Sequence, residues 1–262
     1  MTDVHIVGAV RTPIGKFGGS LAELSAADLG VSVVTEAMRR ANVSPGDVGE
    51  LIFGNARQAG GGPNPARQIS VRAGIPESIA AYTVNQACGS GLKAVILGTQ
   101  ELKLGRSSVV VAGGAESMSR VPYFVEGARW GARLGNKKLV DGMYQDGFLC
   151  PLAQQIMGET AETLAVEYGI PREEQDAFAA ESQCRAAAAE AAGRFDDERI
   201  PLTLTDRKGK SVAFATDEHV RPDADIESMR KLPPVFSKEG TVTAGNASGI
   251  TDGASAMVLM TG

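Results

Sequence analysis

The strongest constraint on the fold is a set of short apolar segments in which apolar and polar residues do not alternate. These segments lie at residues 4–10 (VHIVGAV), 50–55 (ELIFGN), 79–87 (IAAYTVNQA), 107–119 (SSVVVAGGAESMS) and 254–260 (ASAMVLM). Strands of this kind are buried on both faces of a sheet. Helical patterns separate them, and one of these begins at a capping-box-like Ser25–Asp28 pair. The order predicts an α/β fold with a mixed, mostly parallel sheet that helices cover on both faces.

The composition of the chain changes after Ser119. Residues 120–242 hold most of the charged and aromatic residues, including the single tryptophan, and show helical patterns near 157–168 and 172–192. The last stretch returns to Gly-, Ala- and Val-rich sequence. A chain of 262 residues is long enough for one large core and a further subdomain. We therefore expect an α/β domain at 1–119 and 243–262, with an α-rich loop subdomain inserted at 120–242.

Charge and cysteine content exclude several classes of function. The net charge of −5 gives no overall positive field for nucleic acid, and no apolar run approaches the roughly 20 residues of a membrane span. Three widely spaced cysteines and two histidines support neither a disulfide framework nor a metal site. We expect a cytoplasmic protein with reduced thiols, no metal, and no nucleic-acid or membrane partner.

Cys88 lies between a predicted strand and a predicted helix, in the segment Asn85-Gln86-Ala87-Cys88-Gly89-Ser90-Gly91. A helix N-terminus lowers the pKa of a thiol, and the thiolate is the form that accepts acyl groups. Flanking glycines leave room for a substrate carbonyl, and the Cys88 backbone N–H could donate to the oxyanion formed on attack. Free cysteine is also among the most buried residue types. The spacing alone fits a nucleophile and a small core residue equally well.

Seven ordered blocks extend the pattern over residues 4–260. They are RTPIGKFGG (11–19), NPARQ (64–68), NQACGSGLKA (85–94), GGAESMS (113–119), MGETAE (157–162), EEQDAFA (173–179) and KEGTVTAGNASGITDGA (238–254). Together they closely resemble the thiolase family, which comprises acetyl-CoA acetyltransferases and 3-ketoacyl-CoA thiolases. The resemblance implies a thiolase-like layered fold and a ping-pong reaction. In that reaction Cys88 is acylated by an acyl-CoA or by cleavage of a 3-ketoacyl-CoA, and the acyl group then passes to a second CoA species. It implies CoA as substrate and no tightly bound cofactor.

The resemblance also implies a set of residues that contact CoA. The matching positions are Met157, Arg221, Ser228, Leu232, Phe236, Ala244 and Ser248. An arginine can meet a phosphate or stack on adenine, and a phenylalanine can pack against the ring. Without the family match, these residues would be a solvated arginine, a core phenylalanine and loop serines. Many thiolases have His-Met-Gly where this chain has Ile156-Met157-Gly158, so an imidazole contact is absent and the acyl-chain preference stays open.

Full-length thiolases continue into a second domain with an Asn-Glu-Ala-Phe motif, a Gly-His-Pro histidine and a Cys-x-Gly-Gly-Gly loop. None of these strings occurs in the sequence, and neither His5 nor His219 matches the activating histidine. The resemblance therefore implies an N-terminal portion whose partner is the C-terminal thiolase domain, with a homodimer or homotetramer at full length. We expect the chain alone to be a weak or inactive catalyst with exposed apolar surface and a tendency to self-associate.

Two other functions compete with this interpretation. Ketoacyl-synthase-like condensing enzymes also place a cysteine at a helix N-terminus, but RTPIG, GGAESMS and TAGNASG favour a thiolase. A non-catalytic subunit that binds CoA or acyl-CoA would use the loop subdomain without turnover. The residues do not distinguish condensation from degradation in fatty acid metabolism, because both directions use the same groups.

Overall fold

The computed structural model describes residues 3–205 and 208–262, which form two compact units. Unit 1 comprises the chain up to Val121 together with Asp196–Glu218 and Ile250–Gly262, and unit 2 comprises Pro122–Phe195 and His219–Gly249. These bounds differ from the expected domain limits, because residues 196–218 group with unit 1 and residues 243–249 with unit 2. The functional division into a catalytic domain and a CoA-binding insertion stays a prediction.

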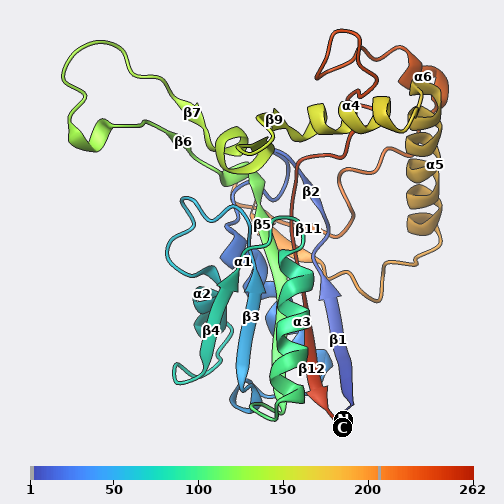
Figure 1. The fold of residues 1–262 in the computed structure, drawn as a ribbon. Coiled ribbons are helices and arrows are strands. Elements are labelled where there is room, and N and C mark those ends of the chain that lie inside the picture. Colours follow the sequence, from blue (N-terminus) through green and yellow to red (C-terminus); the bar gives the residue numbers. More distant parts are fainter. Residues whose placement is uncertain (1–2, 206–207) are drawn as a thin grey trace. The chain divides into compact units, whose positions relative to one another are not determined.

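Unit 1 is built on a six-stranded sheet in the order β1-β12-β5-β3-β4, with β2 paired to β12 (Figure 1). A separate two-stranded hairpin, β10–β11, also belongs to this unit. Short 3₁₀ turns lie at Pro45–Asp47 and Met118–Arg120. The elements in chain order are β1 (Val4–Arg11), β2 (Gly15–Lys16), α1 (Ala26–Arg40), β3 (Glu50–Gly54), α2 (Pro65–Arg72), β4 (Ala80–Val84), α3 (Ser90–Lys103), β5 (Val109–Ser117), β10 (Leu202–Thr205), β11 (Ser211–Phe214) and β12 (Thr251–Thr261).

The strand pairings confirm a mixed sheet, in which two pairings are parallel and three are antiparallel. β3 pairs in parallel with both β4 and β5. β12 is antiparallel to β5 on one side and to β1 on the other, so β1, β3, β4 and β5 all point the same way. The last strand of the chain thus lies between the first strand and β5. The predicted segments correspond to β1, β3, β4, β5 and β12 with their expected positions.

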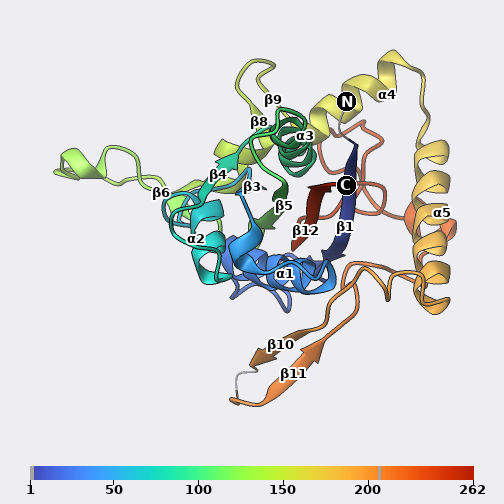
Figure 2. The same ribbon diagram turned by 90° about the horizontal axis from the view of Figure 1, so that it is seen from below.

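Helices cover both faces of this sheet, as predicted. Figures 1 and 2 show α1 and α2 on one face and α3 on the other. Successive strand residues point to opposite faces, so Leu51 and Phe53 join a core cluster on the α1 side. Ile52 and Val110 join a second cluster with Ala94 of α3. Because each strand contributes to both clusters, its sequence is apolar throughout.

Glycines allow α3 to lie directly on the sheet. A Cβ on Gly54 of β3 would lie 2.5 Å from Gly91 N and would overlap the Ser90 carbonyl carbon. A Cβ on Gly114 of β5 would lie 3.2 Å from the Cα of Gly91. The first turn of α3 therefore contacts strand backbone with no intervening side chain. This contact fixes the height of the helix N-terminus above the sheet.

An ion-pair network joins residues 196–218 to β1. Arg11 donates to both carboxylate oxygens of Asp217, at 2.8 and 2.9 Å, and to Glu198 at 2.7 Å. Burial alone would raise the pKa of Asp217, but the bonds from Arg11 and the Ile14 N–H outweigh it and lower that pKa. Residues 196–218 fall within the predicted insertion at 120–242, but ion pairs with Arg11 hold them against unit 1.

Unit 2 consists of short hairpins followed by helices. Its strands form two antiparallel pairs, β6–β7 and β8–β9, and its longest helix is α5. A 3₁₀ turn lies at Ala128–Trp130 and a π-helical turn at Tyr144–Phe148. The elements are β6 (Tyr123–Phe124), β7 (Val140–Asp141), β8 (Leu149–Cys150), β9 (Gln155–Ile156), α4 (Met157–Glu167), α5 (Arg172–Ala191) and α6 (Ile226–Arg230). The two helices expected from the sequence are α4 and α5.

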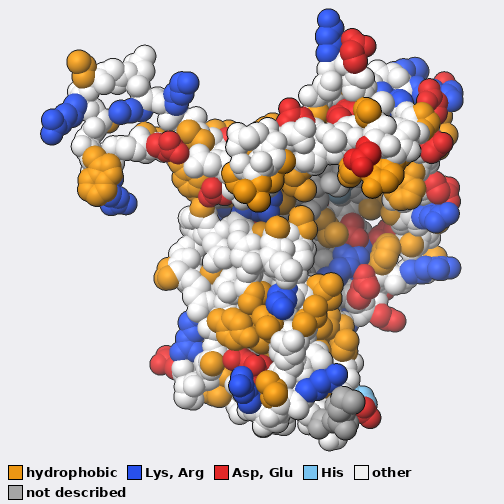
Figure 3. Space-filling model, in the orientation of Figure 1, with side chains coloured by type: hydrophobic (Ala, Val, Ile, Leu, Met, Phe, Trp, Pro, Cys, Tyr) orange, Lys and Arg blue, Asp and Glu red, His pale blue; other side chains and the backbone are white. Residues whose placement is uncertain are grey.

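The outer side of α3 carries exposed apolar side chains, which agrees with the expectation of apolar surface. Leu92 is 68% exposed and Ile96 is 43% exposed. Figure 3 shows hydrophobic side chains gathered on the face of unit 1 that carries α3. Self-association through this face stays a prediction. Within the described ranges, no helix combines the length and apolar character needed to cross a membrane.

We predict that Gly54→Ala will destabilise the protein and displace the start of α3. The added methyl group has no space against the Ser90–Gly91 backbone, and overpacking of this kind costs about 1–3 kcal/mol. Urea unfolding measures the loss. Gly46→Ala is the matched control, because a Cβ at Gly46 meets no atom within 4 Å. Equal unfolding free energies for the two variants would contradict the proposed contact.

Candidate active site

Cys88 lies in the tight loop that connects β4 to α3. The strand ends at Val84 and the helix begins at Ser90, with Gly89 as its N-cap residue. The Cys88 thiol is exposed. The structure thus places the cysteine at the start of a helix, as the sequence predicted. The exposed position also removes the alternative that Cys88 is a buried core residue.

The loop before Cys88 holds an unusual backbone conformation. Ala87 has a φ of +48°, in the left-handed region that non-glycine residues rarely adopt. Three bonds fix it. The Asn85 carboxamide oxygen accepts from the Ala87 N–H at 3.0 Å, while the Ser90 hydroxyl accepts from the Gln86 N–H at 2.9 Å and donates to the Ala87 carbonyl at 2.6 Å. Side chains on both sides of the cysteine therefore determine how it is presented.

A half-buried carboxylate supports this loop through hydrogen bonds. Glu116, at the end of β5, accepts hydrogen bonds from the Asn55 side chain at 2.8 Å and from the backbone N–H groups of Ala56 and Arg57 at 3.0 and 2.9 Å. The carbonyl of Ala56 in turn accepts from the Asn85 side chain at 3.0 Å. Hydrogen bonds thus connect the ends of β5 and β3 to the loop that carries Cys88.

The seven residues predicted to contact CoA all belong to unit 2, whereas Cys88 belongs to unit 1. Most of them are exposed: Met157, Arg221, Ser228, Ala244 and Ser248. Leu232 and Phe236 are half-buried. The structure therefore keeps the polar members of the predicted set accessible to a ligand.

The loop that carries Ala244 and Ser248 is fixed by Asn246 and Asp176. The Asn246 side chain donates to Asp176 at 3.0 Å and to the Thr241 carbonyl at 3.0 Å, and its oxygen accepts from the Thr243 N–H at 2.7 Å. Asp176 is almost fully buried and also accepts from Arg172 at 2.7 Å. The buried Asp176 of α5 thus anchors the loop through Asn246.

Arg172 extends the same framework to the segment that carries Leu232. Its guanidinium donates to the carbonyls of Met229 at 2.7 Å and Leu232 at 3.1 Å. Leu232 in turn packs against Gly245, where a Cβ would lie 2.6 Å from the Leu232 Cδ1. The two loops that carry predicted CoA contacts are thus packed against each other within unit 2.

Glu162 of α4 anchors the start of the 241–248 loop. Its carboxylate accepts from the backbone N–H groups of Thr241 and Val242, at 2.8 and 2.9 Å, and from the Thr241 hydroxyl at 3.0 Å. Burial raises the pKa of Glu162, but these three donors outweigh burial, so its pKa lies below the ordinary glutamate value.

The N-terminus of α4 lies against the aromatic ring of Phe236. A Cβ on Gly158 would overlap that ring, so only glycine fits there. The Ile156 N–H donates to Glu159 at 2.8 Å, and the Ile156 side chain offers no acceptor to the helix. The half-buried position of Phe236 thus follows from its packing on α4, and Met157 beside it stays 50% exposed.

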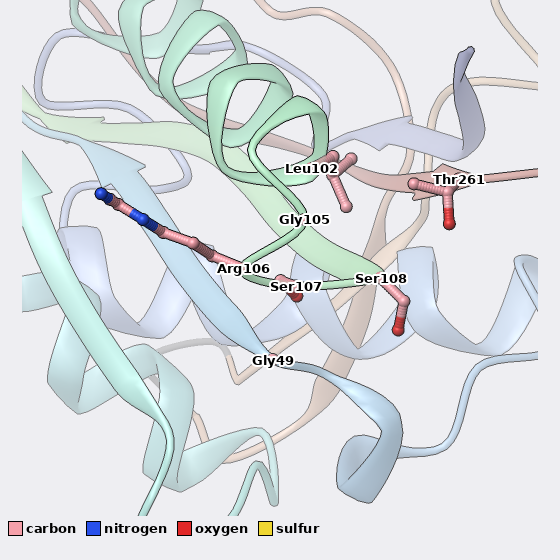
Figure 4. Close-up of a pocket in the computed structure, with 7 residues that line it drawn as sticks. All are labelled: Gly49, Leu102, Gly105, Arg106, Ser107, Ser108 and Thr261. Carbon is pink, nitrogen blue, oxygen red and sulfur yellow. The ribbon is translucent and has the colours of Figure 1, made fainter. Parts of the chain in front are cut away.

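A surface hollow lies at the opposite end of α3 from Cys88. Figure 4 shows its lining, which comes from the end of α3, the starts of β3 and β5, and the end of β12. The residues are Gly49, Leu102, Gly105, Arg106, Ser107, Ser108 and Thr261. None of them is a predicted site residue. In the part of the chain that the structure describes, no cluster of His, Cys, Asp and Glu could hold a metal ion.

The sequence predicts a nucleophile and a set of CoA contacts, which stay predictions, but it did not indicate the groups that support them. Asn85, Ser90 and Glu116 lie inside recognised blocks, yet no role was assigned to them. The same holds for Glu162 and Asn246. The signal that was available is the residue type, because a polar side chain that is shielded from water needs hydrogen-bond partners.

Comparison with known proteins defines the class to which this fold and site belong. The family model for the thiolase N-terminal domain matches residues 4–262. The chain therefore belongs to the thiolase family. This confirms the resemblance that the seven sequence blocks indicated.

Individual relatives agree with this assignment. The chain is 52% identical to an acetyl-CoA acetyltransferase of Cupriavidus necator and 49% identical to one of Pseudomonas aeruginosa, and both alignments cover 99% of this chain and 66% of the relative. The crystal structure of the Bacillus anthracis acetyl-CoA acetyltransferase matches with a TM-score of 0.95 at 42% identity, covering all of this chain and 66% of that one. Human mitochondrial 3-ketoacyl-CoA thiolase, solved in complex with CoA, matches with a TM-score of 0.93 at 41% identity, covering 99% of this chain and 65% of that one. The chain thus spans 66% of the length of the curated relatives named above.

We predict that Glu162→Gln will destabilise the protein at neutral pH and much less in acid. The folded-state pKa of Glu162 is lowered, so its stabilising effect is present above the unfolded-state pKa and is lost as the pH falls through the folded-state pKa. Hydrogen bonds to a charged acceptor suggest a loss of about 1–3 kcal/mol near pH 7. Urea unfolding at a series of pH values measures it.

Glu167→Gln is the control for this comparison, since Glu167 is an exposed residue of the same helix. Its unfolding free energy should stay within about 0.5 kcal/mol of wild type at each pH. A pH-independent difference between Glu162→Gln and wild type would show that the carboxylate charge does not hold the 241–248 loop.

Proposed function

We propose that this chain is part of a thiolase-type acyltransferase, an acetyl-CoA C-acetyltransferase, in which Cys88 is the nucleophile. The observation that carries the proposal is the exposed Cys88 thiol in a rigid loop at the start of α3. Membership of the thiolase family and about 50% identity to acetyl-CoA acetyltransferases support the choice of reaction. Because the chain spans 66% of those relatives, the activity of the complete enzyme is part of the proposal.

The proposed chemistry starts with attack of the Cys88 thiolate on the thioester carbonyl of an acyl-CoA. A tetrahedral oxyanion forms and then collapses, the CoA thiolate leaves and takes up a proton, and the acyl group remains on the cysteine as a thioester. In this proposal the Cys88 backbone N–H donates to that oxyanion. In the condensation direction, the α-carbon of a second acyl-CoA loses a proton and attacks this thioester, the Cys88 thiolate leaves, and a 3-ketoacyl-CoA forms. Thiolysis runs the same steps in reverse: Cys88 takes the acyl group by cleavage of a 3-ketoacyl-CoA and passes it to CoA.

CoA binding is proposed for unit 2, through the seven residues inferred from the resemblance. Arg221 is exposed and has no ion-pair partner among residues 3–205 and 208–262, so its guanidinium is available to a phosphate. Phe236 and Leu232 offer apolar surface beside the glycines they pack against. The CoA complex of the human mitochondrial relative supports CoA as the ligand. CoA acts as substrate in this proposal, and no tightly bound cofactor is invoked.

The second candidate function is a non-catalytic subunit that binds CoA or acyl-CoA. It uses the same exposed residues of unit 2 but leaves Cys88 unmodified. The rigid presentation of Cys88 favours the enzyme, because a binding module has no need to hold Ala87 in a left-handed conformation next to an exposed thiol.

Incubation with isotope-labelled acetyl-CoA, followed by peptide mass spectrometry, tests the proposal. We expect the label as one acetyl thioester on the peptide that contains Cys88, and its complete loss in Cys88→Ala. Cys184→Ala is the control, because Cys184 is also an exposed thiol. Saturable CoA binding without any adduct would support the binding subunit and overturn the proposed enzyme.

Further expectations about the complete protein rest on the same proposal. The remaining third of a thiolase chain is the proposed partner of unit 1, and the exposed apolar residues of α3 offer a surface for such a contact. A homodimer or homotetramer at full length, weak catalysis by the present chain, and a cytoplasmic location stay predictions.

A further inference from the structure

We propose that Ser90 is a positioning residue for acyl transfer: its hydroxyl turns the Ala87–Cys88 peptide so that the Cys88 N–H faces the acyl group. This inference rests on the proposed function, since it concerns the oxyanion that forms when Cys88 is acylated. Ser90 itself touches no reacting atom. It acts through the peptide group that precedes the nucleophile.

Ser90 is a buried residue whose hydroxyl bonds to two backbone groups of the preceding loop. The residue is 4% exposed, and its hydroxyl accepts from the Gln86 N–H at 2.9 Å while donating to the Ala87 carbonyl at 2.6 Å. Its own backbone N–H donates to the same carbonyl at 3.1 Å. The oxygen of Ala87 therefore accepts two hydrogen bonds from one residue, and both pull it toward the first turn of α3.

The direction of that carbonyl decides the direction of the Cys88 N–H. The described chain has no cis peptide bond, and in a trans peptide the C=O and N–H of one unit point in opposite directions. With the Ala87 oxygen turned toward Ser90, the Cys88 N–H points away from it. In residues 3–205 and 208–262 this N–H donates to no acceptor, so it remains available to an incoming oxyanion.

The conformation has an energetic cost that the side-chain bonds offset. A left-handed alanine such as Ala87 lies about 1–2 kcal/mol above its preferred conformations. The Asn85 carboxamide oxygen contributes by accepting the Ala87 N–H at 3.0 Å. Ser90 supplies more of these bonds than Asn85, because its hydroxyl bonds both to the Gln86 N–H and to the Ala87 carbonyl.

A purely structural role for Ser90 makes a different prediction from a positioning role. If the hydroxyl only stabilised the start of α3, its loss would change every reaction of the thiol alike. If it orients the Cys88 N–H, its loss impairs only reactions that pass through an oxyanion. Acylation by an ester has such an intermediate, whereas alkylation by iodoacetamide displaces iodide directly and has none.

The experiment compares these two reactions at Cys88 in Ser90→Ala. p-Nitrophenyl acetate transfers its acetyl group to the thiolate and releases p-nitrophenolate, and peptide mass spectrometry follows each modification at Cys88. We expect the rate of acetylation divided by the rate of alkylation to fall by about 10- to 100-fold relative to wild type, in the range for a weakened oxyanion donor. An unchanged ratio overturns the proposal.

Two further variants keep the result interpretable. Ser32→Ala is the matched control, because the Ser32 hydroxyl donates to the Asp28 carbonyl inside α1, and its ratio should equal that of wild type. Ser90→Thr retains a hydroxyl and should recover most of the ratio. If Ser90→Ala does not fold, Asn85→Ala removes the acceptor of the Ala87 N–H at an exposed position, and a wild-type ratio there contradicts the mechanism.

The ester also separates this inference from the proposed function. It needs no CoA-binding surface, so it reports on the Cys88 N–H even if acetyl-CoA leaves no adduct on the wild-type chain. Absence of that adduct with a reduced ester ratio in Ser90→Ala refutes the proposed function and retains the role of Ser90. Adduct formation with an unchanged ratio supports the proposed function and refutes the role of Ser90.

Discussion

Direct backbone contact between the first turn of α3 and the two strands beneath it determines the position of Cys88, the proposed nucleophile. Gly54 and Gly114 leave no side chain between helix and sheet, so Gly91 approaches both strands closely. A helix held by backbone contact has little freedom to rise or slide, because protein interiors are close-packed. The residues just before the helix are covalently joined to its fixed first turn, so their position is fixed as well. Cys88 is one of them, which places its thiol at a defined height above the strand ends.

The loop around Cys88 adds orientation to this position. Hydrogen bonds from Asn85 and Ser90 hold Ala87 in a conformation that its own sequence disfavours. Glu116 supports the loop through the backbone after β3. An arrangement in which local strain is maintained by surrounding bonds is typical of functional sites. Cys88 is therefore exposed, while the side chains that hold its loop are buried or bonded to backbone.

Unit 2 follows the same division between framework and ligand-facing residues. Asp176 and Glu162 use their carboxylates to hold backbone and side-chain donors of the 241–248 loop, so their charges are satisfied inside the protein. Of the residues proposed to meet CoA, those on and beside that loop are exposed except for Leu232 and Phe236, which are half-buried. Buried polar groups require partners, and here those partners are the loops themselves. Rigid loops reduce the ordering cost of binding a long, flexible ligand such as CoA.

The sequence by itself determined the main strands and helices and the class of fold, and it singled out Cys88 as the candidate nucleophile. Unalternating apolar segments identify strands buried on both faces, and the Ser25–Asp28 pair identified the start of α1, which the structure confirms with bonds of 2.8 and 3.1 Å. These features are local, so a short window of residues contains the information. The seven blocks added the family because their order and spacing are specific.

Only the tertiary structure decided the order of the strands and the groups that support the site. β12 enters the sheet between β1 and β5, and residues 196–218 join unit 1 through the pairing of Arg11 with Asp217. Ser90 and Asn85 acquire their roles from partners that the turn brings together. Such contacts depend on distances between residues that are remote in the chain, or on the exact path of one loop. Local pattern fixes which residues prefer a strand or a helix, whereas long-range packing and hydrogen bonding select one arrangement among those that the pattern allows.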